Sequence, residues 1–534
     1  MATEGKRSNH GGYDVTVWRN VTERGESLRL PAVNEQTATA VDTALDVLLS
    51  DELEPIVDMV LRAAGGDTYE ALAHDSRCRF RRMDDGNGWS FAVESVSGRD
   101  PLGDQSPDRF AGLPAELAQR FPARTENSYP NGYEQVAQLF DSPHAPDLCV
   151  VHAAAHNWED QGGHRGEHGS LDAVQARAPF VLSGAGVAQG GMVDRHCRLV
   201  DVAPTVLALL GVEPGPGIAL NGGRRDDAFL ARQDGEPLLD VLDGVGGAHR
   251  PKHVVGFLLD GCNPNVLYAM AAAGDAPNVA RLIANGTAFR YGAMSGLPTV
   301  TLANHTATLT GCYPGHHGIV HNAWWDRASG EQVITNSPAT WPWAMRRLAP
   351  DVETLHEAVQ RHLPGAHTVS VDEPTDRGAS WSTFDAIRAG RMPERFPVDS
   401  LENATERFVR PSKDYRRMSI IDHLGAEECV SAWSDRDRLP VFTWMNFTLT
   451  DAAFHEGGPH SEIAEASVRD TDARLGRVLA AVERAGVFDD TAFFLVADHG
   501  MEETNPAVTG DWAVQLRAEG LTFRDEAFGF LYFL

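Results

Sequence analysis

Three apolar segments in the second half of the chain end in acidic side chains. They are residues 253–260, 441–451 and 491–501, and their last polar side chains are Asp260, Asp451 and the adjacent pair Asp498 and His499. In open α/β sheets, ligands bind at the carboxyl ends of the strands. Together with His455, four residues after Asp451, these side chains form a candidate set of Zn²⁺ ligands. The alternative is that they are three unrelated helix caps.

The segments that must position these side chains alternate between strand and helix patterns. The run HVVGFLLD at 253–260 is typical of a buried parallel strand. Helical spacing follows at 277–286, 301–311, 352–363 and 466–486, and further apolar strands are predicted at 367–371, 146–152 and 179–184. This alternation predicts an α/β fold with a doubly wound, mostly parallel sheet.

The overall composition excludes several classes of protein. The chain has 534 residues, 42% of them hydrophobic, which is enough for a large core. No apolar run approaches the roughly 18 residues of a membrane helix, and the first residues lack the apolar stretch of a signal peptide. The six cysteines form no CxxC pair, so we expect reduced thiols and a cytoplasmic protein.

The net charge of −29 is the most unusual bulk property of the chain. Asp and Glu number 75 against 46 basic residues, and the lysines are Lys6, Lys252 and Lys413. Such a surface repels nucleic-acid duplexes and anionic membranes, so neither is an expected partner. It suits a halophilic protein kept in solution at high salt. A GC-rich genome that encodes Arg in place of Lys is the alternative.

Four ordered motifs resemble one known family. FLLDG, LPTVTLANHTATLTGCYPGHHGIVHN, TDAAFHEGGPHS and VADHGM are similar to the nucleotide pyrophosphatase/phosphodiesterase branch of the alkaline phosphatase superfamily. The likeness covers most of residues 253–501. It implies a sheet of alkaline-phosphatase type, a threonine nucleophile and two divalent metal ions, with zinc favoured over manganese or cobalt. Two such ions can hold the attacking and leaving oxygens of an in-line displacement.

The resemblance assigns roles residue by residue. The first metal takes Asp260, Thr301, Asp498 and His499, the second takes Asp451 and His455, and Asn322 binds a phosphoryl oxygen. Thr301 also begins a predicted helix, where free N–H groups favour an anion. Thr299 is the nearest alternative nucleophile, but the spacing of Thr301 to Asn304 and His305 in TLANH favours Thr301.

The second metal lacks one ligand in this half of the chain. The family places a histidine in a GxHG loop after ADHGM, but no histidine follows His499. The segments GEHGSL (166–171) and LVDVAPTVLALLG (199–211) are similar to the closing section of the superfamily, yet they precede its opening section. We therefore expect a circular permutation in which His168 completes the second site. The alternatives for this ligand are His164 and, less favoured, His152 and His156.

A circular permutation predicts a specific organisation of the chain. Residues 1–235 would be the usual C-terminal part of the catalytic domain, 236–252 a glycine-rich linker and 253–534 the usual N-terminal part. Within them, 36–100 is expected to be a small α+β accessory unit and 372–440 a cap inserted over the site. Two other layouts stay open: a separate copied domain in the first half, or a domain swap in which His168 serves a second subunit.

The expected function is metal-dependent hydrolysis of phosphodiester or nucleotide pyrophosphate bonds through a phosphothreonine intermediate. The substrate would be a small phosphate ester or a nucleotide, and the sequence does not indicate an oligomeric state. A phosphomonoesterase or a phosphonoacetate-type hydrolase is the alternative within the superfamily. An inactive protein that binds metal or nucleotide is the alternative from another class. Trp324 and Trp325 either stack on a base or leaving group or pack internally.

Overall fold

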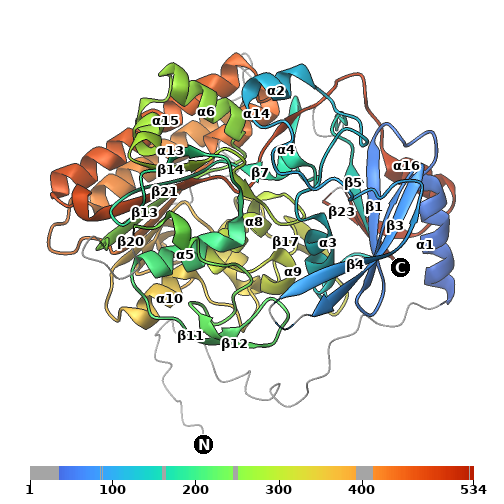
Figure 1. The fold of residues 1–534 in the computed structure, drawn as a ribbon, viewed down its shortest axis with the longest axis horizontal. Helices are drawn as coiled ribbons and strands as arrows, with labels where there is room; N and C mark the ends of the chain where they lie inside the picture. The colour runs from blue at the N-terminus through green and yellow to red at the C-terminus, as the bar shows by residue number, and fades with distance from the viewer. Residues whose placement is uncertain are drawn as a thin grey trace, which may run out of the picture.

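The computed structural model describes residues 35–84, 86, 88–158, 164–243, 250–392, 413–527 and 529–534. Two β-sheets lie side by side in it, and the larger one has helices on both faces (Figure 1). Among the described residues, no helix has both the length and the hydropathy of a membrane span. The predicted fold class, α/β with a doubly wound and mostly parallel sheet, is confirmed.

The larger sheet has eight strands drawn from both halves of the chain. In spatial order they are β19 (Trp381–Ser382), β18 (Thr368–Val371), β20 (Phe442–Phe447), β13 (His253–Leu259), β21 (Thr491–Val496), β8 (Phe180–Gly184), β14 (Gly286–Phe289) and β9 (Gly191–Val193). The first five are parallel, whereas β8 is antiparallel to both β21 and β14. A strand of the first half is therefore inserted between two strands of the second half.

The central strands match the apolar runs of the sequence. Strands β20 and β21 are buried at every position, as expected of parallel strands covered on both faces. On β13, Gly256 is required by packing, because a Cβ atom there would lie 2.0 Å from the ring of Trp444 on β20. One boundary was wrong: the strand predicted to run to Asp451 ends at Phe447, and Asp451 lies on the helix that follows.

Helices cover both faces of this sheet (Figure 1). One layer contains α6 (Pro264–Ala273), α7 (Pro277–Ala284), α13 (Lys413–Ala432), α14 (Leu449–Gly457) and α15 (Glu462–Ala485). The opposite layer contains α5 (Val202–Leu209), α8 (Thr301–Thr310) and α10 (Leu355–His362). The predicted helices at 277–286, 301–311, 352–363 and 466–486 are thus confirmed to within a few residues at their ends.

The second sheet also contains strands from both halves of the chain. Its order is β23 (Phe523–Glu526), β24 (Phe530–Phe533), β5 (Leu148–His152), β1 (Val57–Gly65), β2 (Thr68–Ala73), β3 (Ser76–Asp84) and β4 (Trp89–Ser97). Strand β24 at the C-terminal end pairs with β5, and β5 pairs with β1. The predicted accessory unit at 36–100 therefore extends a sheet of the main body.

Short ribbons and helices complete the described chain. The ribbons are β7 (Arg177–Ala178) with β15 (Ala293–Met294) and β10 (Cys197–Arg198), β6 (Gly166–Glu167) with β22 (Glu502–Glu503), β11 (Gly215–Ile218) with β12 (Arg224–Ala228), and β16 (Ala323–Asp326) with β17 (Glu331–Ile334). The remaining α-helices are α1 (Glu35–Leu48), α2 (Leu113–Ala118), α3 (Gly132–Phe140), α4 (Ala173–Ala176), α9 (Pro314–His317), α11 (Thr383–Arg388) and α16 (Trp512–Ala518). Short 3-10 helices are η3 (Leu199–Asp201), η4 (Leu239–Val241), η5 (Trp341–Arg347) and η6 (Phe488–Asp490).

The structure also shows how the predicted linker and cap segments are placed. In the linker, Leu238, Val241 and Leu242 are buried in the main core, while 244–249 lie outside the described residues. In the segment 372–440, which the sequence predicts to be a cap, helix α13 packs against β18 and β20 of the larger sheet. Residues 393–412 of that segment lie outside the described residues.

Candidate metal and phosphate site

The predicted aspartate and histidine ligands of the second half meet at one edge of the larger sheet. Asp260 directly follows β13, and Asp498 and His499 come just after β21. Because β13 is parallel to both β20 and β21, the carboxyl ends of these three strands lie together. Gly261 has a positive φ of 62°, and a Cβ atom there would lie 2.6 Å from Asp451 Oδ1, so the loop after Asp260 requires glycine.

Asp451 and His455 reach this edge from α14. They are four residues apart on one helix and therefore share a face. His455 Nε2 lies 3.3 Å from Asp451 Oδ1, and His455 Nδ1 lies 2.8 Å from the carbonyl oxygen of Gly166. The Gly166 contact allows Nδ1 to donate its proton and leaves Nε2 as the metal-facing nitrogen.

His168, from the first half of the chain, joins the same cluster. Its Nε2 lies 3.8 Å from Asp451 Oδ1, and its ring stacks on His499 with 3.7 Å between centroids. One ligand atom each from His168, Asp451 and His455 lies within 4.8 Å of the others. The ribbon of β6 with β22 holds this loop beside the segment that follows His499. The structure thus brings the two halves together around the ligands that the sequence predicts for the second metal.

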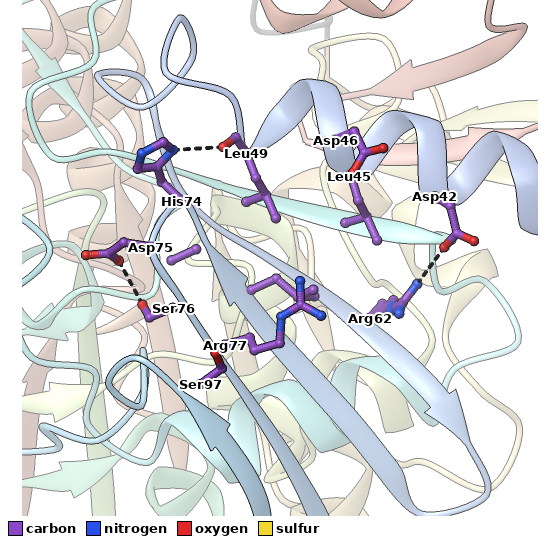
Figure 2. Close-up of a pocket in the computed structure, with 12 residues that line it drawn as sticks. Asp42, Leu45, Asp46, Leu49, Arg62, His74, Asp75, Ser76, Arg77 and Ser97 are labelled. Atoms are coloured by element: carbon purple, nitrogen blue, oxygen red, sulfur yellow. Dashed lines mark hydrogen bonds and ion pairs between the residues drawn. The ribbon is translucent and has the colours of Figure 1, made fainter.

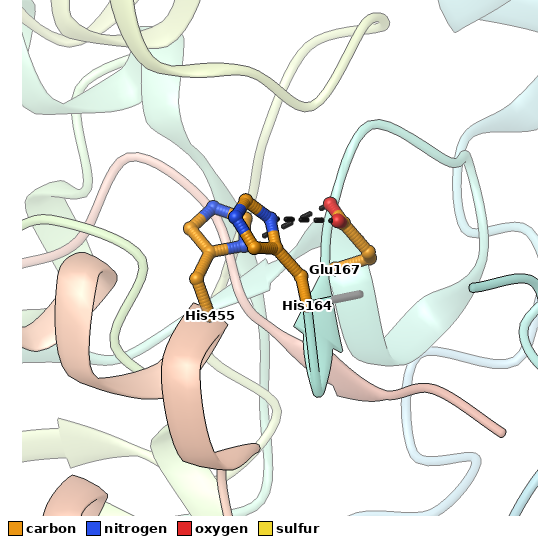
Figure 3. A group of neighbouring side chains, drawn as sticks. All are labelled: His164, Glu167 and His455. Carbon is orange, nitrogen blue, oxygen red and sulfur yellow. Dashed lines mark hydrogen bonds and ion pairs between the residues drawn. The ribbon is translucent and has the colours of Figure 1, made fainter. Parts of the chain in front are cut away.

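The alternative histidines surround this cluster without sharing its centre. His164 lies beside Glu167 and His455 (Figure 3). Its Nδ1 is 3.0 Å from Glu167 Oε1, and the centroid of its ring is 4.5 Å from that of His455. His152 Nε2 lies 3.3 Å from the His168 carbonyl, and His156 Nε2 lies 3.1 Å from the Gly510 carbonyl. Among the described residues, only His168 of these four falls in one group with Asp451.

The two threonines that competed as nucleophile have different surroundings. Thr299 is fully buried; its Oγ1 donates to the Ser170 carbonyl at 2.7 Å and accepts from the Gly169 N–H at 2.9 Å. Thr301 is the first residue of α8, whose N-terminus has no side-chain cap. Within the described part of the chain, no hydrogen bond occupies the Thr301 hydroxyl. Thr299 is therefore structural, and Thr301 has the free hydroxyl.

Thr299 also connects the nucleophile segment to the metal ligand. Its carbonyl oxygen lies 2.9 Å from His168 Nδ1, so this bond holds the imidazole with Nε2 directed toward Asp451. Sequence reasoning treated Thr299 only as a rival nucleophile and missed this role. No local signal reveals it, because the contact joins residues 131 positions apart.

Asn322 lies beside the first turn of α8. Its Oδ1 accepts a hydrogen bond from the Leu302 N–H at 3.0 Å. With the oxygen engaged in this way, the amide NH₂ group is the part of the side chain that can donate to a ligand. Because Asn322 contacts the Leu302 N–H, it lies at the N-terminus of α8, next to Thr301. An anion is favoured at such a helix terminus.

The ligand cluster contains buried polar atoms that have no hydrogen-bond partner. These atoms are Asp260 Oδ1, Asp451 Oδ1, Asp498 Oδ2, His305 Nε2 and His499 Nε2. Buried polar groups in native proteins are otherwise almost always satisfied. Bound cations would satisfy all five, because the donors are the carboxylate oxygens and imidazole nitrogens that divalent zinc-type ions prefer. The residues present therefore fit a metal centre.

The charges in the ligand cluster also fit a metal centre. Burial and the nearby Asp498 and Asp451 carboxylates raise the pKa of Asp260 well above its usual range. Burial lowers the pKa of His455, but the neighbouring Asp451 outweighs it and raises that pKa to about 10. Among the described residues, the ion-pair partners of the three aspartates are all histidines. Concentrated negative charge without Arg or Lys is suited to divalent cations.

The two tryptophans after Asn322 are occupied by packing. Trp324 is 1% exposed and belongs to a core cluster. The Trp325 ring has the Arg524 guanidinium over it, 3.6 Å from the ring centroid. Of the two interpretations of this pair, internal packing agrees with the structure.

Two cavities of the described part of the chain lie away from the metal ligands. One, of about 500 Å³, lies between α1 and strands β1 to β3, where Arg62, His74 and Arg77 line it, as Figure 2 shows. The other, of about 520 Å³, lies around Ser106 and Gln119. The candidate site is thus identified by its converging ligand atoms.

Comparison with known proteins decides the family. The sequence profile of the type I phosphodiesterase / nucleotide pyrophosphatase family matches residues 254–529, just over half of the chain. The chain belongs to this family. The resemblance seen in its motifs is thereby confirmed, and the matched region contains all the predicted ligands except His168.

Individual relatives of this phosphodiesterase family member are distant. An uncharacterized pyrophosphatase/phosphodiesterase of Schizosaccharomyces pombe is 32% identical over 260 residues, 47% of this chain and 45% of that protein. Ectonucleotide pyrophosphatase/phosphodiesterase family member 7 of Homo sapiens is 24% identical over 264 residues, 48% of this chain and 50% of that protein. The chain thus spans about half the length of these curated relatives.

A distant likeness to a solved structure covers about half of the chain. Phosphonoacetate hydrolase from Sinorhizobium meliloti, solved with phosphonoformate, is 21% identical, with a TM-score of 0.32. The likeness covers 47% of this chain and 57% of that one.

Proposed function

We propose that this protein is a metal-dependent hydrolase of phosphodiester or nucleotide pyrophosphate bonds. The observation that carries the proposal is the free Thr301 hydroxyl at the N-terminus of α8, in a chain whose Asp and His ligand atoms converge with no other partner. Family membership supports the same reaction class. The substrate would be a small phosphate ester or a nucleotide, because the chain's charge of −29 disfavours a nucleic-acid duplex.

The proposed centre holds two divalent ions, with zinc favoured. One would be bound by Asp260, Thr301, Asp498 and His499, and the other by Asp451, His455 and His168. When bound, these ions would lower the pKa of the threonine hydroxyl and neutralise charge on the attacking and leaving oxygens.

The chain's own residues account for the remaining parts of the reaction. The Thr301 oxygen attacks phosphorus, the bond from phosphorus to the leaving oxygen breaks, and a phosphothreonine is left. The free N–H groups of the first turn of α8 and the amide NH₂ of Asn322 donate to the phosphoryl oxygens, where negative charge develops. Water then breaks the bond between phosphorus and Thr301 and restores the hydroxyl.

We also infer that the chain is a circular permutation of the family fold. The insertion of β8 between β21 and β14 and the pairing of β24 with β5 support a single domain built from both halves. Helix α1, the first described element, packs against the C-terminal strand β24, as expected if these ends are joined in the usual order (Figure 1). The segment 13–18, predicted to follow Leu534 in that order, lies outside the described residues.

The test compares a diester with a monoester. Release of p-nitrophenol from bis(p-nitrophenyl) phosphate should exceed release from p-nitrophenyl phosphate, and a chelator should abolish it. Thr301→Ala should remove turnover of the diester but keep bound zinc, because three protein ligands of that ion remain. Preference for the monoester or for a phosphonate would assign one of the neighbouring activities, and more than a few per cent activity in Thr301→Ala would exclude this nucleophile.

A further inference from the structure

We infer that the cavity between α1 and strands β1 to β3 is a binding site for a small zwitterion, an amino acid with an apolar side chain. The cavity has a volume of about 500 Å³, within the range of about 300–1,000 Å³ typical of small-molecule sites. None of the residues that line it is a predicted metal ligand. The inference therefore goes beyond the proposed function and does not depend on it.

One wall of this cavity is a single face of α1. Asp42, Leu45, Asp46 and Leu49 have the i, i+3, i+4, i+7 spacing of residues that share a helix face. Leu45 belongs to the core that α1 forms with the second sheet, so the helix is held against that sheet. This wall is therefore a fixed part of the fold.

The opposite wall belongs to the second sheet and to the turn between β2 and β3. Its side chains come from neighbouring strands and are those of Arg62, Leu72, Ala73, His74, Asp75, Ser76, Arg77 and Ser97. Three of them, at positions 73, 76 and 97, are small and leave space above the sheet. Leu72 packs in the same core as Leu45, so this wall also offers apolar surface.

Polar contacts close the two ends of the cavity. At one end, Asp42 Oδ1 lies 3.7 Å from Arg62 Nη1. At the other end, His74 Nδ1 lies 2.8 Å from the carbonyl oxygen of Leu49. In the view of Figure 2, the side chain of Arg77 lies between these two ends. The contacts connect the helix to the strands and leave the space around Arg77 open to a ligand.

Most charged side chains around the cavity have a partner of opposite charge. The pairs are Asp42 with Arg62, His74 with Asp51, and Asp75 with Arg124, at 3.7, 3.4 and 2.8 Å. Within the described part of the chain, Asp46 and Arg77 are the exceptions, because neither side chain makes an ion pair or a hydrogen bond. They carry opposite charges and stand on opposite walls, yet they do not pair with each other. The cavity thus presents one free carboxylate and one free guanidinium.

Arg77 also differs from the next arginines on its side of the sheet. Side chains alternate along a strand, so Arg77, Arg79 and Arg81 of β3 share one face. Arg79 Nη1 lies 3.0 Å from Glu70 Oε1, and Arg81 pairs with Glu94. Of these three arginines, the one that lines the cavity is the one without a carboxylate partner among the described residues.

A zwitterion matches this arrangement of charges. The Arg77 guanidinium can bind a carboxylate through two parallel hydrogen bonds, and the Asp46 carboxylate can accept from an ammonium group. Leu45, Leu49 and Leu72 supply apolar surface for a hydrocarbon side chain. A simple anion would be repelled by Asp46, and a simple cation would be repelled by Arg77. An amino acid such as leucine satisfies both charges and covers the apolar surface.

The experiment is calorimetric titration of the full-length protein with L-leucine. We expect saturable binding to the wild type. Arg77→Gln and Asp46→Asn should each weaken this binding by about 10- to 100-fold, because each removes a charge-assisted contact. Both positions are exposed, so the variants should fold, which thermal unfolding verifies. The analogues 4-methylpentanoate, without the ammonium group, and 3-methylbutylamine, without the carboxylate, should bind the wild type more weakly by a similar factor.

Arg81→Gln is the matched control. Arg81 is an exposed arginine on the same strand and face that does not line the cavity, so its replacement should leave the affinity for L-leucine unchanged. An equal loss in Arg81→Gln would indicate a general effect of charge and overturn the site. Absence of saturable binding to the wild type, or wild-type affinity in Arg77→Gln, would overturn it as well. Binding of 4-methylpentanoate as tight as that of L-leucine would overturn the assignment of a zwitterion.

Discussion

Replacing Thr299 should weaken both the fold and the second metal site. The buried hydroxyl makes two hydrogen bonds, to the Ser170 carbonyl and the Gly169 N–H, across the junction of the two halves. Thr299→Val keeps the shape of the side chain but leaves the buried Ser170 carbonyl and the partly buried Gly169 N–H without this partner. At about 1–3 kcal/mol for each unsatisfied group, the free energy of unfolding should fall by about 2–6 kcal/mol. Because the Thr299 carbonyl also positions His168, the affinity of the His168 site for Zn²⁺ should fall too.

Urea unfolding, Zn²⁺ titration and the kinetics of bis(p-nitrophenyl) phosphate hydrolysis measure these effects. Thr299→Ser is the control, because it keeps the hydroxyl and loses only a methyl group, for about 1 kcal/mol. In Thr299→Val, kcat should fall more than KM rises, since the altered loop holds a metal ligand. Wild-type stability and Zn²⁺ affinity in the valine variant would refute the argument that this threonine couples the two halves.

Three further predictions test other parts of the structure. Replacing a residue that only supports a metal ligand typically costs about 10- to 100-fold in activity. His168→Ala should reduce kcat/KM by more than this, whereas the reduction in His164→Ala should stay within this range. The reverse ranking would make His164 the ligand. Burial raises the pKa of Asp58 to about 7, although Tyr129 donates to it, so unfolding releases a proton. Stability measured by urea unfolding should therefore fall by up to about 1.4 kcal/mol per unit as pH rises from about 4 to 7, and Asp58→Asn should remove this slope. The chain has a net charge of −29, and salt screens the repulsion between its acidic groups. The melting temperature of the protein should therefore rise between about 0.1 M and 1 M salt. A flat or falling melting temperature would contradict the interpretation that the protein is halophilic.

The sequence by itself determined the elements and most of the site. Apolar runs such as 253–259 and 491–496 are buried strands because both of their faces are covered by helices. Asp451 and His455 share a helix face whatever the rest of the chain does, because four residues make about one turn. The place of Thr301 at the start of a helix is likewise local. These features depend on neighbouring residues, so periodicity and motif spacing reveal them.

Only the tertiary structure decided which distant residues complete the site. His168 and His164 lie in one loop, and the choice between them depends on the Thr299 carbonyl 131 positions away. The pairing of β8 with β21 and β14 and the approach of Glu373 to His305 likewise join segments far apart in the chain. Such contacts form because burial of the whole sheet selects one arrangement of its strands. No short stretch of sequence contains that information, since the energy that selects the arrangement is shared by the entire core.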